Sequence, residues 1–178
     1  MIYELLQKCL ILSTPVIVSG VLHMVVVRLN LLSVLKIPLH SSLFGANKTW
    51  RGVVVMPPLT FLGMMLAKWI DQESSTDLIP DQYVLLSLCL GLAYVAAELP
   101  NSWIKRKLKI PPGLPSPKFP LLFAIGDQAD SVIGCTIVYA LYSIGKPGDW
   151  VFLVIFGTLL HLALNLALFG LGLRKNAL

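Results

Sequence analysis

Charged residues are scarce in this 178-residue chain, at only 13% of the total, whereas 56% of the residues are hydrophobic. A soluble domain usually carries about 25% charged residues. The shortage therefore excludes an ordinary soluble globular domain and predicts an integral membrane protein. Because it leaves no room for a separate soluble domain, we expect residues 1–178 to form a single membrane-embedded domain.

Several familiar site patterns are missing as well. The chain has three cysteines, Cys9, Cys89 and Cys135, which all fall in apolar runs and form no Cys-x-x-Cys pair. Such cysteines are expected to be buried free thiols, and nothing indicates a disulfide or a zinc site. The GxxxxGK[ST] phosphate-binding loop is also absent.

Long apolar runs are what the chain has instead. A membrane-spanning helix needs about 20 mostly apolar residues, and five stretches qualify, at roughly 5–27, 52–70, 82–104, 120–144 and 150–172. The first run lacks an A-x-A cleavage site, so we expect a retained span and not a signal peptide. The sequence thus predicts an all-α membrane protein with five transmembrane helices. We expect the second helix to kink or begin irregularly at Pro57-Pro58.

Basic and acidic residues alternate between the connections of these helices. The segments 28–51 and 105–118 hold nine Lys and Arg residues and no acid, and the tail adds Arg174 and Lys175. The segment 71–81 instead holds four acids and no base. Eleven of the fourteen basic residues thus lie on one side, which the positive-inside rule assigns to the cytoplasm. We expect the N-terminus outside, the C-terminus in the cytoplasm, and two basic cytoplasmic loops.

Polar side chains also lie inside the predicted spans. Asp127 and Asp130 share one helical face, since residues three apart are neighbours on a helix. Glu98 and Asn165 lie in two other spans at similar depth, with His161 one turn deeper than Asn165, at about 1.5 Å per residue. Taken alone, His161 and Asn165 would be ordinary interhelical hydrogen-bonding partners. Their common depth predicts a polar site that opens toward the basic loops.

The two aspartates need a neutralising partner. Like charges this close resist ionisation, so one carboxyl is protonated, a base pairs with them, or a metal ion binds them. Carboxylate oxygens suit Mg²⁺, which takes further ligands from water and substrate phosphates, and we favour the metal. The alternative function is a small ion- or proton-coupled transporter, which would also use intramembrane acids. Transporters favour repeated halves, and the sequence shows no internal repeat.

Two basic segments offer side chains that could hold phosphates. LFGANKTWRG at 43–52 contains Lys48 and Arg51, and SWIKRKLKIPPGLPSPKFP at 102–120 has Lys105 and Arg106 nearest the membrane. Lys holds a phosphate as a point charge and Arg does so bidentately. Membrane topology alone also explains these bases. Because they flank spans, we do not expect nucleic-acid binding.

Four pieces of sequence together resemble the CDP-archaeol synthases, which are related to the CDP-diacylglycerol synthases. They are NKTWRG at 47–52, SWIKRKL at 102–108, DQAD at 127–130 with Gly134 after it, and HLALN at 161–165 with LGLRKN after it. The chain departs from the family pattern at Ala97 and Glu98, where the archaeal form has Gly-Asp. It departs again at Asn101, where a small residue is usual.

The resemblance implies a membrane cytidylyltransferase of phospholipid biosynthesis, with the whole chain as its catalytic domain. It would transfer CMP from CTP to an archaeol-type or phosphatidic-acid-like lipid phosphate, with Mg²⁺ as cofactor, at a site facing the cytoplasm. The implied partners are CTP, the lipid phosphate and the bilayer. The implied catalytic residues are Asp127, Asp130, Lys105 and Arg106; the substrate-binding residues are Asn47, Lys48, Thr49, Arg51, Ser102, Gln128, His161 and Asn165; and the metal ligands are Asp127, Asp130 and Glu98.

Overall fold

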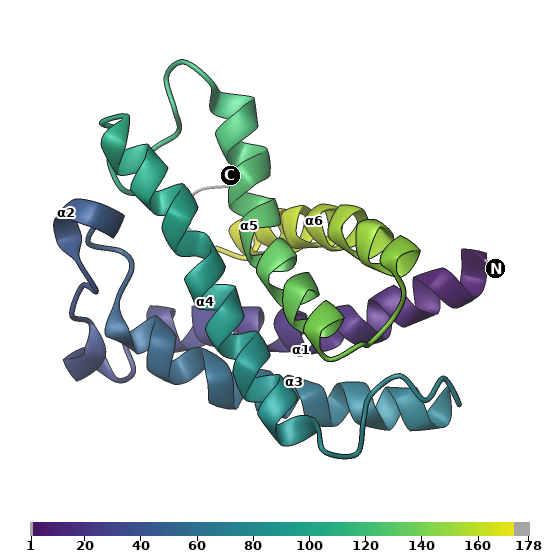
Figure 1. Cartoon of the computed structure of the whole chain (residues 1–178). Helices are drawn as coiled ribbons and strands as arrows, with labels where there is room; N and C mark the ends of the chain where they lie inside the picture. Colours follow the sequence, from purple (N-terminus) through teal and green to yellow (C-terminus); the bar gives the residue numbers. More distant parts are fainter. Residues whose placement is uncertain (1, 173–178) are drawn as a thin grey trace.

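Five long helices dominate the structure, a computed structural model that describes residues 2–172. Each is long and apolar enough to cross a membrane, which confirms the predicted class of integral membrane protein. A 3₁₀ helix, η1 (Ser33–Leu35), and the one-turn helix α2 (Ser41–Phe44) lie between the first two long helices. The long helices are α1 (Ile2–Arg28), α3 (Trp50–Glu73), α4 (Tyr83–Lys107), α5 (Pro120–Leu141) and α6 (Pro147–Gly170), as labelled in Figure 1.

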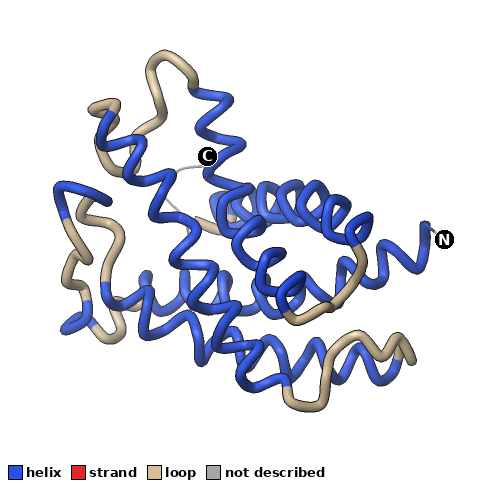
Figure 2. Tube along the Cα trace, in the orientation of Figure 1, coloured by secondary structure: helices blue, strands red, loops and turns tan. Residues whose placement is uncertain are grey.

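The connections between these helices are loops, as Figure 2 shows, and the described range contains no β-strand beyond one isolated bridge between Pro38 and Thr49. The predicted spans are confirmed with shifted ends. α4 continues to Lys107 because its last turn is basic, and positive charges stabilise a helix C-terminus. The expected irregular start at Pro57-Pro58 is wrong, since α3 begins at Trp50 and runs through both prolines.

Successive helices pack side by side, α1 on α3, α3 on α4, α4 on α5 and α5 on α6, and α6 returns to α1. A glycine lies at each of the first four contacts. A Cβ atom on Gly134 of α5, for example, would lie 2.5 Å from the Cβ of Ala97 on α4. Small residues let membrane helices approach closely where lipid offers no hydrophobic driving force. The four glycines are Gly63, Gly91, Gly134 and Gly157.

The apolar core fills one end of this bundle. It draws on the first halves of α1, α4 and α6 and the second halves of α3 and α5, for instance Leu12, Met64 and Leu90. The hydroxyl of Tyr139 donates to the Leu12 carbonyl at 2.7 Å and ties α5 to α1. The three cysteines are free thiols. Two are buried as predicted, but Cys89 of α4 is only half-buried, at the margin of the core.

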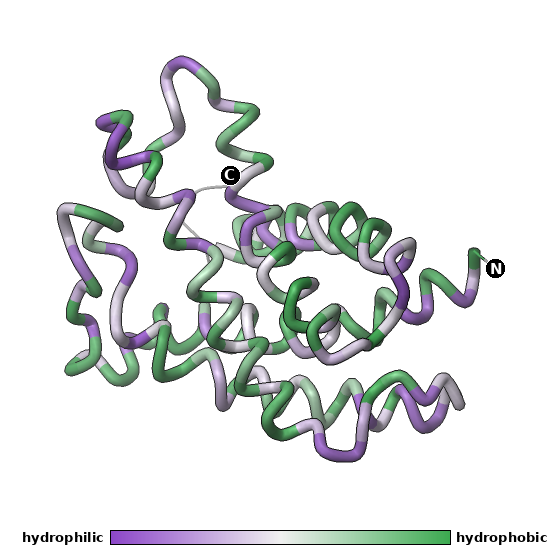
Figure 3. Tube along the Cα trace, viewed as in Figure 1, coloured by the Kyte–Doolittle hydropathy of each residue, from purple (hydrophilic) through white to green (hydrophobic). Residues whose placement is uncertain are grey.

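The loops at the other end carry the basic residues. Figure 1 shows residues 29–49 and 108–119 at one end of the bundle and residues 74–82 and 142–146 at the opposite end. Figure 3 shows hydrophilic stretches in the loops and in the part of α4 and α5 nearest the basic end. The predicted grouping of the basic loops is therefore observed. Arg174 and Lys175 lie outside the described residues, and which end faces the cytoplasm stays a prediction.

Candidate active site

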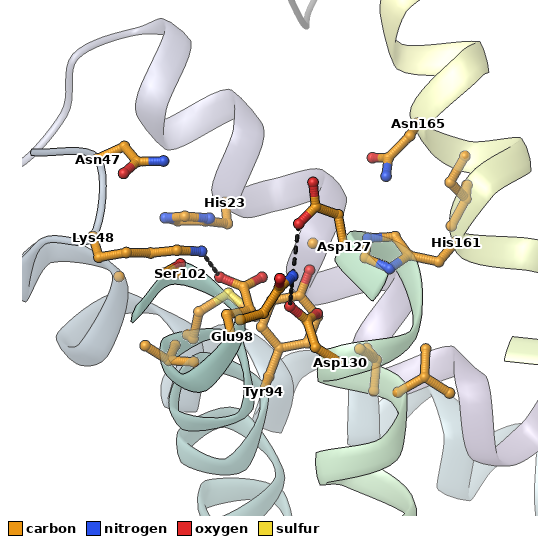
Figure 4. A pocket seen from close by; sticks show the side chains of 18 of the residues that line it. His23, Asn47, Lys48, Tyr94, Glu98, Ser102, Asp127, Asp130, His161 and Asn165 are labelled. Carbon is orange, nitrogen blue, oxygen red and sulfur yellow. Dashed lines mark hydrogen bonds and ion pairs between the residues drawn. The ribbon is translucent and has the colours of Figure 1, made fainter. Parts of the chain in front are cut away.

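A cavity of about 990 Å³ occupies the basic end of the bundle, and all five long helices contribute to its wall. Its deeper part is apolar, with side chains such as Val16, Leu153 and Leu160. Its part nearer the loops carries the charged and amide side chains drawn in Figure 4. The cavity thus joins an apolar interior to a polar mouth. Of the predicted site residues, all line this cavity except Gln128.

The carboxylate pair lies on the α5 side of the cavity. Asn101 of α4 donates from its single amide nitrogen to Asp127 Oδ1 at 2.7 Å and to Asp130 Oδ2 at 3.0 Å. Lys105, one turn further along α4, forms an ion pair with Asp127. Of the three ways to neutralise the pair, the structure thus contains the base, together with a bridging amide.

One face of α4 supplies most of the polar wall. Tyr94, Glu98, Asn101 and Lys105 follow one another at intervals of four, three and four residues, which places them on one stripe of a helix. Ser102 lies beside this stripe and also lines the cavity. The stripe faces α5 at Asn101 and Lys105, whereas Glu98 meets the loop before α3.

Lys48 reaches the cavity from that loop and pairs with Glu98 (Figure 4). The loop is held as a narrow hairpin, because Leu39 N–H donates to the Lys48 carbonyl at 2.8 Å. Asn47 and Thr49, on either side of Lys48, line the cavity too. Burial disfavours the charged ammonium of Lys48, but the neighbouring Glu98 carboxylate outweighs it, so the pKa of Lys48 lies above its ordinary value.

Two arginines stand at the cavity mouth. Arg51, in the first turn of α3, is only 6% exposed and donates through Nη1 to the Leu31 carbonyl at 3.3 Å. Arg106 lies against Gly45, whose φ of +90° and lack of a side chain let the loop approach it; a Cβ there would lie 2.7 Å from Arg106 Nη1. Within residues 2–172, the buried Nε atoms of both arginines have no hydrogen-bond partner, so each guanidinium retains donor capacity for an anion.

The α6 side of the site is built around Gln128. The side-chain oxygen of Gln128 accepts from Asn165 Nδ2, and its backbone carbonyl lies 3.0 Å from His161 Nδ1. Gln128 itself is buried between α5 and α6, so the structure places this predicted substrate-binding residue behind the cavity wall. The two contacts of Gln128 nevertheless hold the predicted residues His161 and Asn165 at the cavity wall and fix their orientation.

The predicted metal ligands are only partly brought together. Within residues 2–172, no three His, Cys, Asp or Glu side chains gather closely enough to hold a metal ion. Glu98, expected as a third ligand, pairs with Lys48, and not with Lys105 as its sequence neighbourhood would allow. Asp127 and Asp130 alone still fit Mg²⁺, because this ion is commonly held by one or two carboxylates plus substrate phosphates and water.

Asn101, His23 and Tyr94 line the cavity close to the predicted residues and were not predicted. Asn101 bridges the aspartates, His23 of α1 faces the Lys48–Glu98 pair (Figure 4), and the ring of Tyr94 lies 6.3 Å from that of His161. Tyr94 and Asn101 could have been predicted, because their spacing from Glu98 places all three on one face of the same helix. His23 could have been found as a lone ionisable side chain in a spanning helix.

Comparisons with known proteins bear on the resemblance. The CDP-archaeol synthase of Staphylothermus marinus is 28% identical over 127 residues, which cover 70% of this chain and 62% of that protein. Those of Thermofilum pendens and Pyrobaculum arsenaticum are each 30% identical, over 74% and 75% of this chain and 57% and 73% of their own lengths. The chain thus spans about three fifths of the length of the first two relatives. No solved structure matches it significantly. Residues 3–177 match the CarS-like family described as CDP-archaeol synthase, which confirms the resemblance, and the chain belongs to that family.

Proposed function

We propose that this chain is a membrane cytidylyltransferase that transfers CMP from CTP to a lipid phosphate and releases pyrophosphate. The observation that carries the proposal is a single cavity, sunk among apolar helices, whose wall holds four basic side chains together with the adjacent carboxylates of Asp127 and Asp130. Membership of the CDP-archaeol synthase family supports the same chemistry. We take residues 1–178 as one catalytic domain and an archaeol-type lipid phosphate as the first substrate to test.

In the proposed reaction, an oxygen of the lipid phosphate attacks the α-phosphorus of CTP. A new P–O bond forms to that phosphorus, and its bond to the oxygen bridging to the β-phosphorus breaks, so that pyrophosphate leaves. The attacking phosphate is already ionised near neutral pH, and therefore the site needs no general base to create the nucleophile. Catalysis then depends on holding two anions together and offsetting their charge.

The basic side chains are suited to that task. Lys48 and Lys105 each exchange their carboxylate partner for a phosphate oxygen when substrate enters. Arg51 and Arg106 offer unpaired Nε–H donors for bidentate contacts with phosphates. Asn47, Thr49 and Ser102 add neutral donors near the mouth, and His161 and Asn165 orient a substrate from the α6 side.

Mg²⁺ is the proposed cofactor, with Asp127 and Asp130 as its protein ligands and Glu98 nearby. When bound, Mg²⁺ would offset the negative charge of the triphosphate and of the leaving pyrophosphate. The release of Lys105 from Asp127 would free the oxygens of that carboxylate as the lysine turns to phosphate. The apolar part of the cavity would hold the lipid chains at the level of the bilayer interior. The polar mouth, proposed to face the cytoplasm, would admit CTP.

The test is pyrophosphate release by the purified protein with CTP, Mg²⁺ and either an ether-linked isoprenoid glycerol phosphate or phosphatidic acid. We expect release with the isoprenoid lipid, its abolition by EDTA, and at least a 100-fold lower kcat in Asp127→Asn. Glu73→Gln, which changes an exposed acid at the far end of α3, is the matched control and should keep full activity. Unchanged activity in Asp127→Asn or in EDTA would refute the metal role. No release with either lipid would refute the activity and leave transport as the function to test.

A further inference from the structure

Asn101 makes contacts that ordinary packing between two helices does not require. One amide nitrogen lies 2.7 Å from Asp127 Oδ1 and 3.0 Å from Asp130 Oδ2. An amide NH₂ carries two hydrogens, so each carboxylate receives one of them. The side chain therefore fills the space between two like charges on successive turns of α5.

The neighbours of the two aspartates add hydrogen bonds and van der Waals contacts around this amide. Gly126, immediately before Asp127, has no side chain, and a Cβ placed there would lie 3.9 Å from Asn101 Nδ2. Asp130 also accepts from the backbone N–H of Ser131 at 2.6 Å. Among the described residues Asp130 forms no ion pair, so its neighbours supply hydrogen bonds but no full positive charge at contact distance.

The charge balance explains why an amide is suited to this place. With both carboxylates ionised, Asp127, Asp130 and Lys105 together carry one net negative charge. A lysine in place of Asn101 would cancel that charge and weaken the attraction for a cation. An apolar side chain would leave two carboxylates facing each other with no donor between them, which raises the free energy of the folded state. The neutral donor joins the carboxylates and keeps the site attractive to a divalent cation.

We propose that Asn101 is a positioning residue that stands in for the divalent cation, holding Asp127 and Asp130 together until the ion arrives. This inference rests on the metal role in the proposed function. It predicts that the wild-type bundle depends little on divalent cations for its stability, because the amide cross-links α4 to α5 without them. It also predicts that, in a variant without the amide, the bound ion holds the two carboxylates together instead.

The test is the thermal unfolding of the full chain in detergent, in EDTA and in Mg²⁺, without lipid and both with and without CTP. In EDTA, Asn101→Ala should lower the midpoint by about 4–8 °C, and Mg²⁺ should restore most of that loss. Asn101→Asp puts a third carboxylate beside the pair and should show a larger cation-dependent recovery. Wild type should shift by less than either variant.

A merely structural role for Asn101 gives a different result. Asn101→Ala would then lose the same stability in EDTA and in Mg²⁺, and that outcome would overturn the proposal. A second check uses Asp130→Asn, which removes one of the two like charges. In that background Asn101→Ala should lose its dependence on the cation, and an undiminished dependence would contradict the bridging role.

These measurements separate this inference from the proposed function. Unfolding midpoints do not require transfer of CMP, so a cation-dependent recovery in Asn101→Ala would support the positioning role even if no pyrophosphate were released. Conversely, pyrophosphate release that needs Mg²⁺, together with variants whose stability ignores the ion, would uphold the enzyme and refute the role of Asn101.

Discussion

Lys48 and Glu98 stand 50 residues apart in the chain, yet their side chains form an ion pair on the wall of the cavity. A second lysine, Lys105, is paired in the same way with Asp127. Before substrate binds, each lysine therefore contacts a carboxylate at the place where a phosphate is proposed to bind. The Glu98 carboxylate raises the pKa of Lys48 above its ordinary value despite burial. The stabilisation from its pair is present below the ordinary lysine pKa and is lost as the pH rises through the raised value.

Glu98→Gln separates the two roles that Glu98 could have. The amide keeps the size of the side chain but removes the charge that places Lys48. Because Lys48 would then be less well fixed, we expect the KM for CTP to rise about tenfold, the cost of a few hydrogen-bonding contacts. The Mg²⁺ concentration that gives half the maximal rate should not change. Both quantities come from initial rates measured over a matrix of CTP and Mg²⁺ concentrations.

Lys48→Met is the matched comparison, since it removes the phosphate-binding charge itself. It should raise the KM for CTP further than Glu98→Gln does. An increase of tenfold or more in the Mg²⁺ requirement of Glu98→Gln would instead place Glu98 among the metal ligands.

Gly134→Ala should damage both the stability and the site. Its added Cβ would lie 2.5 Å from the Ala97 Cβ and 2.9 Å from the Ala93 carbonyl oxygen, so α5 has to move away from α4. Overpacking of this kind costs about 1–3 kcal/mol. Because Asp130 lies one turn before Gly134, the shift should also weaken the Asn101 bridge and lower kcat. Thermal unfolding and pyrophosphate release measure the two effects.

Gly148→Ala is the control for that variant, because a Cβ there meets no atom of the described part of the chain within 4 Å. It lies in the first turn of α6 and should unfold at the wild-type temperature or slightly above it. Equal midpoints and rates for the two variants would show that close contact at Gly134 is not needed.

Asp71 should matter for stability and not for activity. It is 1% exposed at the end of α3 and accepts from Leu78 N and Ile79 N, each at 3.0 Å, and from the Thr76 hydroxyl at 2.5 Å. Asp71→Ala leaves these donors without a partner at the end opposite the cavity. We expect a loss of about 2–4 kcal/mol in the free energy of unfolding. Denaturation in detergent measures it, and kcat well below the unfolding temperature should stay unchanged.

Glu73→Ala tests whether the hydrogen bonds of Asp71 or its negative charge stabilises this loop. Glu73 lies two residues further on and is exposed, so its loss should change stability by less than about 0.5 kcal/mol. A comparable loss in both variants would mean that negative charge, and not the hydrogen bonds of Asp71, stabilises this loop.

The spanning helices could be predicted from sequence because each depends on its own apolar run. The polar site could be predicted in part, since Glu98, Asp127 and Asn165 share a depth that follows from counting residues along each helix. The rotation of one helix against another could not be predicted this way. It depends on contacts such as Gly134 against Ala97, which link residues far apart in the sequence.

Pairings across the cavity depend on that rotation. Asn101 looked like a departure from a family pattern, and only the packing of α4 against α5 shows that its amide reaches both aspartates. His23 could have been noticed as an ionisable side chain in a spanning helix, but only the packing of α1 shows that it lines the cavity. Gln128 was expected to bind substrate from the family resemblance, yet its side chain accepts from Asn165 of α6 and does not line the cavity.

The orientation of the bundle gives the last prediction. Eleven of the fourteen basic residues belong to segments assigned to one side, and positively charged loops are retained in the cytoplasm. We expect a membrane-impermeant maleimide to label Ser75→Cys, in the acidic loop, in intact spheroplasts of an expressing bacterium. Pro117→Cys, in the exposed loop between α4 and α5, should react only after permeabilisation. Both variants carry Cys89→Ser, since the other two native cysteines are buried. Labelling of Pro117→Cys alone in intact spheroplasts would reverse the topology and place the cavity mouth on the side that lacks CTP.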